Sequence, residues 1–356
     1  MKKLVKWLLI LLSVFVLIIG SYVDYVLVDY HRIPDNQTLT VTQKAPKGKL
    51  STNHNYRIAT YNIGFGAYLP DFSFFMDGGK SSWAKSKKSV QYAVSSAVNT
   101  IKKEKVDFAL FQEVDLNGTR SYHVNEENLL TKQLTNYSHT FAINYHSSFL
   151  FYPLTQPHGK NTSGLATYSR YPITSALRRS LPISTSFSKY LDLDRAYAIR
   201  HIPVTNDKDL VLFNVHLSAY GNSDSIRKAQ LAMLKADMEK ELAKGNYILV
   251  GGDFNHNLKA KEGDKSSVTW AYPFPRSSLG DDFTLAMDSL SQAELENLAN
   301  SARNTDTSYV KGKTYTVMLD GFIISNNIKV NHLTTKETDF AYSDHEPVLM
   351  DFQLLD

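Results

Sequence analysis

The chain of 356 residues contains no cysteine. Disulfide bonds, thiolate metal sites and cysteine nucleophiles are therefore excluded, and so is the lipid-modified cysteine with which a bacterial lipoprotein begins. Internal repeats and segments of low complexity are also absent from the sequence. Hydrophobic residues make up 43% and charged residues 21% of the chain, as in folded proteins, and the length allows one large or two small domains.

The chain also has little excess of charge, with a formal net charge of +4. Residues 1–33 carry four basic and two acidic side chains, so +2 belongs to this segment and +2 to all the rest. A domain that binds duplex nucleic acid usually has a concentrated basic surface, and near-neutral charge slightly disfavours such a partner. The clearest basic clusters are typical of a solvated helix face: Lys85, Lys87 and Lys88, then Lys102, Lys103 and Lys105.

One long apolar run is present, from Trp7 to Val23, and three lysines precede it. Its 17 residues cover roughly 25 Å as a helix, slightly less than a hydrocarbon core of about 30 Å. Residues 25–28 extend the span if Asp24 lies at the interface. Because a basic flank stays in the cytoplasm, we expect a single-pass anchor that places the remaining chain outside the cell. Secretion after signal-peptide cleavage is the alternative, but no Ala-x-Ala cleavage site follows the run.

The next segment, residues 30–55, has no periodic pattern. Prolines, glycine and asparagines interrupt it, as in loops and linkers. The sequence therefore predicts three parts: a basic start and transmembrane anchor over residues 1–29, an extracytoplasmic tether over 30–55, and a globular domain over 56–356.

Strands and helices are both expected in the globular domain. Some of the apolar runs follow one another directly, whereas others are separated by helical patterns, which favours helices on the outer faces of two central sheets. We expect helices over residues 90–101 and 225–244. We expect strands over residues 57–62, 106–111, 164–169, 196–203, 210–217, 247–251, 317–325 and 348–354.

Polar residues follow several of these predicted strands. Rigid strand ends commonly present side chains to a shared cleft. We therefore expect one site that contains Asn62, Glu113, His216, Asp253 and the pair Asp344/His345.

These residue types suit the cleavage of a phosphate ester. Carboxylate and amide oxygens, from Glu113, Asp253, Asn62 and Asn255, favour Mg²⁺ or Mn²⁺ over zinc. Imidazole groups can donate to phosphoryl oxygens or move protons near neutral pH.

Asp320 lies in an apolar strand, where a carboxylate is least costly to bury as the hydrogen-bonded partner of a histidine. Each residue also has a structural alternative. Glu113 alone could cap a loop, His216 could be a core histidine, and Asp253 and Asn255 are common turn residues. Only their joint order along the chain favours a catalytic site.

In that order the polar clusters resemble the endonuclease/exonuclease/phosphatase superfamily, which includes DNase I-like nucleases, inositol-polyphosphate 5-phosphatases and neutral sphingomyelinases. The resemblance covers nearly the whole domain and is specific for the superfamily, but weak for any one substrate. The matching runs are Ala59–Asn62, Phe111–Val114, Gly164–Ile173, Asn214–Leu217, Gly252–Asn255, Leu319–Phe322 and Ser343–Pro347.

The resemblance implies a four-layered α/β sandwich with two mostly antiparallel central sheets, and a Mg²⁺-dependent catalytic domain. Glu113 would hold the metal, with Asn62 beside it and Asp344 close by. The superfamily includes members with one metal and members with two, and the sequence leaves this choice open.

The resemblance also implies roles at the phosphate. His345 would contact the scissile phosphate and be oriented by Asp320, while Asp253 would orient or activate water. Asn255 would hold a phosphate oxygen, and His216 matches a second histidine of the DNase I and sphingomyelinase branches. Arg195 is a weaker candidate for phosphate contact.

Two positions depart from the branch of abasic-site endonucleases. Gly64 stands where those enzymes carry an acidic residue, and His216 where they carry a tyrosine; both differences argue against DNA repair. The segment 65–83 is rich in aromatic residues. It either forms a wall for a specific substrate or lipid headgroup, or packs on the domain as a small satellite core.

The sequence therefore predicts a monomeric, membrane-anchored, extracytoplasmic phosphoesterase. Its substrate would be nucleic acid, a phospholipid or sphingolipid headgroup, or an inositol phosphate. The alternative is a non-catalytic surface binding protein on the same scaffold. The presence of every expected polar residue disfavours this alternative.

Overall fold

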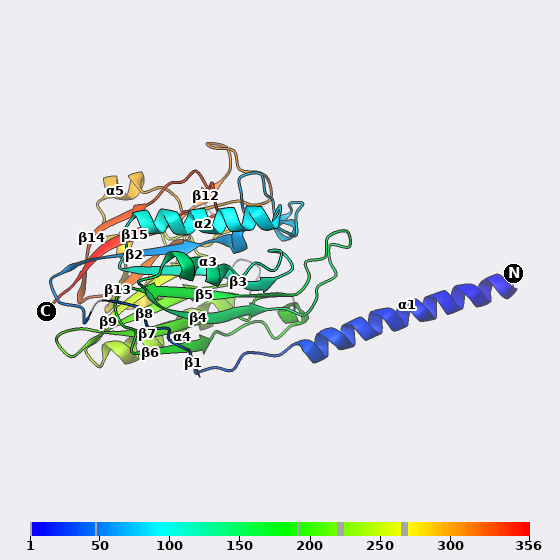
Figure 1. Cartoon of the computed structure of the whole chain (residues 1–356), viewed down its shortest axis with the longest axis horizontal. Coiled ribbons are helices and arrows are strands. Elements are labelled where there is room, and N and C mark those ends of the chain that lie inside the picture. The colour runs from blue at the N-terminus through cyan, green and yellow to red at the C-terminus, as the bar shows by residue number, and fades with distance from the viewer. Residues whose placement is uncertain (1, 47, 191, 219–223, 265–269) are drawn as a thin grey trace.

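Two large β-sheets lie face to face at the centre of the molecule (Figure 1). The computed structural model describes residues 2–46, 48–190, 192–218, 224–264 and 270–356. The six-stranded sheet has the order β14-β15-β2-β3-β5-β4. Its strands are β2 (Asn55–Asn62), β3 (Phe108–Gly118), β4 (Ser138–His146), β5 (Asn161–Ser169), β14 (Ile328–Thr335) and β15 (Val348–Leu354).

The seven-stranded sheet has the order β1-β6-β7-β8-β9-β13-β10. Contacts of β2 and β3 with β9, and of β5 with β8, join it to the other sheet. Its strands are β1 (Gln37–Thr38), β6 (Ser175–Ser180), β7 (Ala196–Pro203), β8 (Asp209–His216), β9 (Tyr247–Asp253), β10 (Phe283–Leu285) and β13 (Asp320–Ser325).

Each sheet contains one parallel pair, β2 with β3 and β8 with β9. A parallel pair needs a crossover connection, and here the crossovers contain α2 (Lys87–Lys103) and α4 (Asp224–Leu242). The other pairs described within the two sheets are antiparallel. The carboxyl ends of β2 and β3 therefore lie at one edge of their sheet, and those of β8 and β9 at one edge of the other.

The helices cover the outer faces of the sheets. Residues of α2 that recur every three or four positions, such as Val90, Val94 and Val98, are buried against the six-stranded sheet. Helix α3 (Glu126–Gln133) packs beside α2, and α4 buries Leu231, Leu234 and Met238 against the other sheet. The predicted α/β sandwich flanked by helices is confirmed.

The remaining elements are short. They are α5 (Gln292–Asn297), the two-stranded sheet of β11 (Ala302–Arg303) and β12 (Thr316–Val317), and the 3₁₀ helices η1 (Gly64–Gly66), η2 (Phe75–Asp77), η3 (Phe187–Tyr190), η4 (Arg276–Leu279) and η5 (Ala286–Ser289).

Helix α1 (Lys2–Asp29) extends away from the sandwich (Figure 1). Its most apolar part has a mean hydropathy of 2.5, and none of that part is buried against the domain. The helix is long and apolar enough to cross a membrane.

The segment 30–55, expected to be a tether, lies along the sandwich over much of its length. Strand β1 pairs with β6, Thr42 pairs with His139, and Leu50 pairs with Val204 and is fully buried. Composition gives no sign of this, because edge pairing uses backbone groups and needs few apolar side chains.

Candidate active site

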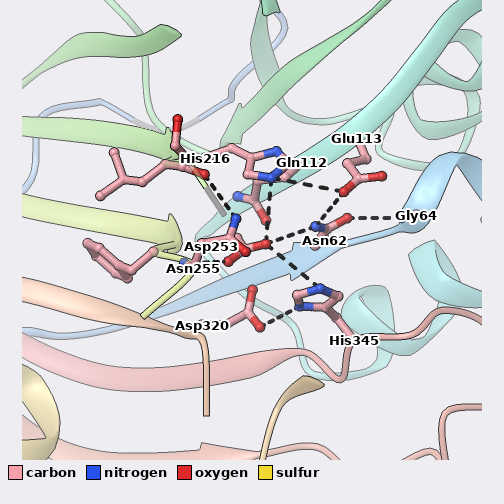
Figure 2. Close-up of polar contacts among 12 residues, drawn as sticks. Asn62, Gly64, Gln112, Glu113, His216, Asp253, Asn255, Asp320 and His345 are labelled. Atoms are coloured by element: carbon pink, nitrogen blue, oxygen red, sulfur yellow. Dashed lines mark hydrogen bonds and ion pairs between the residues drawn. The ribbon is translucent and has the colours of Figure 1, made fainter. Parts of the chain in front are cut away.

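The predicted polar residues converge where the two sheets meet (Figure 2). Asn62, His216 and Asp253 are the last residues of β2, β8 and β9, and Asp320 begins β13 directly opposite Asp253. A cleft of about 600 Å³ opens there. It is lined by six of the predicted residues, Glu113, His216, Asp253, Asn255, Asp344 and His345, while Asn62 and Asp320 contact them from behind.

Local backbone geometry turns two of these side chains into the site. Glu113 has a φ of 54° and lies at a bulge where the pairing of β3 with β5 shifts register between Phe111 and Val114. Asn255 has a φ of 50°. Bulges and left-handed residues are uncommon in strands and re-aim side chains near active sites.

Asn62 links the two sheets at the floor of the cleft. Its Nδ2 donates to Glu113 Oε1 and to Asp253 Oδ2, at 3.1 Å in each case, and its Oδ1 accepts from the Gly64 amide at 3.0 Å. Gly64 has a φ of 51°, and a Cβ there would lie 2.8 Å from Asp344 Oδ1. The chain therefore has no room for a side chain at the position where abasic-site endonucleases carry an acidic residue.

His345 is held by a buried chain of hydrogen bonds. Its Nδ1 lies 2.7 Å from Asp320 Oδ2, which also accepts from Ser301 Oγ at 2.7 Å. Ser301 Oγ in turn accepts from the Asp320 amide at 3.0 Å. Burial alone would lower the pKa of His345, but the Asp320 and Asp253 carboxylates outweigh it and raise the pKa well above its ordinary value. The predicted Asp320–His345 pair is thus present, in contact.

Asp253 lies between the two histidines. Its Oδ2 is 3.7 Å from Nε2 of both His345 and His216, and its Oδ1 accepts from the Asn255 amide at 2.8 Å. Burial raises the pKa of Asp253 to about 7, against the opposing effect of His345. Burial, together with the charges of Arg195 and His345, lowers the pKa of His216 well below its ordinary value. His216 is therefore neutral at neutral pH, although His345 is charged.

The acidic side of the cleft fits a divalent cation. Glu113 and Asp344 are close enough for their charges to interact, and Asn62 bonds Glu113. Burial raises the pKa of Asp344 to about 6; His345 opposes this shift and Glu113 adds to it. A bound cation would relieve the repulsion between these carboxylates, and carboxylate and amide oxygens are the ligands that Mg²⁺ and Ca²⁺ prefer.

A second group could also bind a metal. Ligand atoms of Asp253, Asp320 and His345 lie within 4.8 Å of one another. Here, however, Nδ1 of His345 and Oδ2 of Asp320 already bond each other. On the acidic side, Glu113 accepts from Asn62 Nδ2 and Asp344 accepts from Ser343 Oγ, which are neutral donors, and so we favour this side for the metal.

Three arginines also reach the cleft. Arg195, the weaker candidate from the sequence, donates from Nη1 to Leu217 O at 2.9 Å. Arg120 and Arg303, which the sequence did not single out, line the cleft as well, and Arg120 pairs with buried Asp115 at 2.8 Å. Gln112 and Ser301 were also missed; Gln112 Nε2 donates to Asn214 Oδ1 at 2.8 Å and so joins the sheets below the site. Single buried polar residues of this kind give no pattern in a sequence.

The aromatic segment 65–83 serves as both core and wall. Phe65, Tyr68 and Phe74 are buried in one cluster with the inner face of α2, and the same three side chains line the cleft. The Arg120 guanidinium lies 3.8 Å from the centre of the Phe65 ring. The rings therefore line the cleft, as the first interpretation expects. They also pack on the domain, but as part of the core between α2 and the six-stranded sheet and not as a separate satellite core.

Comparison with protein families gives a match over residues 59–310 to the Endonuclease/Exonuclease/phosphatase family. The chain belongs to this family. Members are metal-dependent phosphoester hydrolases, and this chain is an enzyme of that class. No curated protein sequence gives a significant match.

Solved structures of the family share the fold at low sequence identity. An endonuclease/exonuclease/phosphatase from Beutenbergia cavernae is 16% identical, with a TM-score of 0.58 over 85% of this chain and 72% of that one. TDP2 of D. rerio, complexed with single strand DNA product, is 13% identical, with a TM-score of 0.55 over 85% and 100%. The human Nocturnin catalytic domain, with bound sulfate anion, is 16% identical, with a TM-score of 0.54 over 89% and 97%.

Proposed function

We propose that this chain is a monomeric phosphoesterase anchored by α1, with its catalytic domain outside the cell membrane, and that it uses Mg²⁺ or Mn²⁺. The observation that carries this proposal is the meeting of Asn62, Glu113, Asp253 and the Asp320–His345 pair in one cleft. Lys2, Lys3 and Lys6 before the apolar run support a cytoplasmic N-terminus.

Glu113, Asn62 and Asp344 would hold the metal. A divalent cation there supplies positive charge for the non-bridging phosphate oxygens and activates water. Opposite it, His345 directs Nε2 toward the cleft because Asp320 binds Nδ1. This protonated imidazole would donate to the scissile phosphate and so stabilise the charge that develops there.

Asp253 would orient the attacking water and accept its proton. Asn255 donates one Nδ2 hydrogen to Leu217 O at 2.9 Å, which leaves its second hydrogen for a phosphate oxygen. Neutral His216 would donate to another phosphate oxygen, while Arg195 and Arg303 add positive charge at the wall.

Nucleic acid, a lipid phosphodiester and an inositol phosphate are the candidate substrates. The DNA product in D. rerio TDP2 and the sulfate in human Nocturnin support an anion-binding cleft on this fold. The weak net charge of this chain gives little support to long nucleic acid, and α1 would bring lipids within reach.

A substrate panel tests the proposal. The full chain in detergent micelles is assayed with Mg²⁺ on single-stranded and duplex DNA, RNA, sphingomyelin and inositol phosphates. We expect hydrolysis of at least one class, reversible loss of activity with EDTA, and loss of activity in Glu113→Gln. Glu239→Gln on α4, a residue that pairs with Lys235 at the surface, is the matched control. Hydrolysis of none of these classes would favour the non-catalytic binding protein.

A further inference from the structure

The loop between β4 and β5, residues 147–160, carries the densest group of exposed apolar side chains outside α1 in the described chain. Phe151, Tyr152 and Leu154 are 52%, 71% and 83% exposed. Elsewhere in the described domain such side chains stand singly, at Met76, Tyr92, Phe187, Tyr272 and Val310. A contiguous exposed apolar group marks a surface that is covered by another molecule or by lipid.

This loop is bonded to the end of α1. Tyr22 Oη donates to Phe149 O at 3.0 Å, and the Phe149 amide donates to Tyr25 Oη at 3.1 Å. The rings of Tyr22 and Phe151 meet edge to face, with centroids 5.0 Å apart. Lys160 at the end of the loop pairs with Asp29 at 3.1 Å. Figure 1 shows the loop reaching from the sheet toward the base of α1.

The position of these contacts along α1 sets the depth of the loop. A hydrocarbon core of about 30 Å takes about 20 helical residues, so a span that begins at Trp7 leaves the core near Val26. Tyr22 then lies about 6 Å, one helical turn, inside this outer boundary of the core, and Tyr25 lies at the boundary, next to the interface where tyrosine is enriched. Phe149 is bonded to both, so the loop that follows it starts at the outer boundary of the hydrocarbon core, just below the lipid headgroups.

The orientation of the domain on α1 is fixed as well. Val26 is buried against the domain. Beyond the helix, Arg32 Nε and the Ile33 amide bind the two carboxylate oxygens of Asp194 at 2.6 and 2.9 Å. Asp194 is buried and also pairs with Arg178 at 3.2 Å. The same face of the domain is therefore held toward the membrane.

The loop also continues to the mouth of the cleft. The Phe75 ring packs on Tyr152 and on His158, with centroids 5.8 and 5.5 Å apart. His158 and Met76 line the cleft, and Met76 is exposed. We propose that the 147–160 loop inserts Phe151, Tyr152 and Leu154 into the leaflet beside α1 and so holds the cleft mouth at the lipid headgroups. The proposal rests on the membrane anchoring proposed above, and not on the catalytic roles.

Because the chain has no cysteine, a single introduced cysteine gives a unique probe position. Leu154→Cys, Phe15→Cys in α1 and Tyr92→Cys on α2 each receive the same fluorophore. The full chain is inserted into vesicles of phosphatidylcholine and phosphatidylglycerol in equal amounts, some of whose acyl chains carry a nitroxide quencher. We expect quenching at Leu154 to exceed that at Tyr92 several-fold. Tyr92 has an exposed side chain like Tyr152 and is the matched control.

A second measurement follows the cleft mouth. With nitroxide on the lipid headgroups, a probe at Met76→Cys is quenched in the otherwise unchanged chain. Quenching falls several-fold when Phe151, Tyr152 and Leu154 are all replaced by serine, whereas a probe at Phe15→Cys in the same variant keeps its quenching by the acyl-chain nitroxide.

The outcomes separate the two proposals. Quenching at Phe15 with a Leu154 signal as weak as that of Tyr92 would overturn docking by the loop and leave the anchor standing. Absence of quenching at Phe15 in the vesicles would overturn the anchor and the docking together. Unchanged quenching at Met76 in the triple serine variant would show that the loop does not hold the cleft at the headgroups.

Discussion

His345 on the floor of the cleft and His158 on its rim, which is formed by aromatic rings of segment 65–83, lie in opposite environments. On the floor, His345 lies 2.7 Å from Asp320 and 3.7 Å from Asp253, and these carboxylates raise its pKa despite burial. On the rim, His158 lies against both the Phe74 and the Phe75 ring, with Ser82 Oγ 3.1 Å from its Nδ1. Burial lowers the pKa of His158 to about 3.

The difference shows that surroundings, not residue type, assign the roles in this cleft. The floor keeps charged groups at strand ends, where backbone and Asn62 fix their positions. The rim is formed by aromatic rings of segment 65–83, and burial beside them keeps His158 neutral. Substitutions on the floor should therefore affect turnover, and those on the rim should affect stability.

The largest expected effect is that of His345→Ala. Loss of a charged donor at the scissile phosphate should lower kcat by roughly 10³-fold, with the fold retained. His158→Gln on the rim, a residue with no role at the phosphate in the proposed mechanism, should leave kcat nearly unchanged. The measurement is turnover per folded molecule on the substrate found in the panel, with folding followed by circular dichroism. Full turnover by His345→Ala would remove His345 from the mechanism.

A smaller effect is expected for Asp320→Asn, which keeps the shape of the side chain but removes the charge that orients His345. By analogy with partners that orient metal-bound histidines, kcat should fall roughly 10–100-fold with little change in KM. Asp351→Asn is the matched control, because Asp351 pairs with Arg57 at 2.6 Å in strand pairing away from the cleft. Equal losses in both variants would mean that Asp320 acts only on stability.

The floor could be predicted from the sequence better than the rim. Its residues follow apolar strands in a fixed order, and β7 and β15 have the bounds expected from their apolar runs. The fold class followed from the same pattern. The roles assigned to the floor residues stay predictions, since only their proximity is observed.

Other features gave no periodic signal. Strand β14 is an edge strand with few buried residues, and β4 and β6 carry polar residues at buried positions, so none of the three was expected. The placement of Ser301 under Asp320 and of β1 beside β6 depends on tertiary contacts between residues far apart in the sequence. Such contacts cannot be predicted from the local sequence pattern or from composition.

The smallest expected effect tests the rim through pH. His158 is neutral in the fold because its pKa is about 3, whereas an unfolded chain has the ordinary value of about 6.5. Between these values the unfolded state binds more protons, so the stabilising contribution is complete above about pH 6.5 and is lost as pH falls toward 3. Between pH 7 and pH 5 the contribution of His158 alone should lower the free energy of unfolding by about 2 kcal/mol.

The contribution of His158 is measured by urea unfolding at both pH values. The full chain and its His158→Gln variant are compared, both in detergent. Other buried histidines, such as His256, titrate in both proteins and cancel in the comparison. Glutamine cannot gain a proton. Between pH 7 and pH 5 the free energy of unfolding of His158→Gln should therefore fall by about 2 kcal/mol less than that of the unchanged chain. Parallel losses in the two proteins would mean that water or a nearby acidic group reaches His158, and that the rim does not keep this histidine neutral.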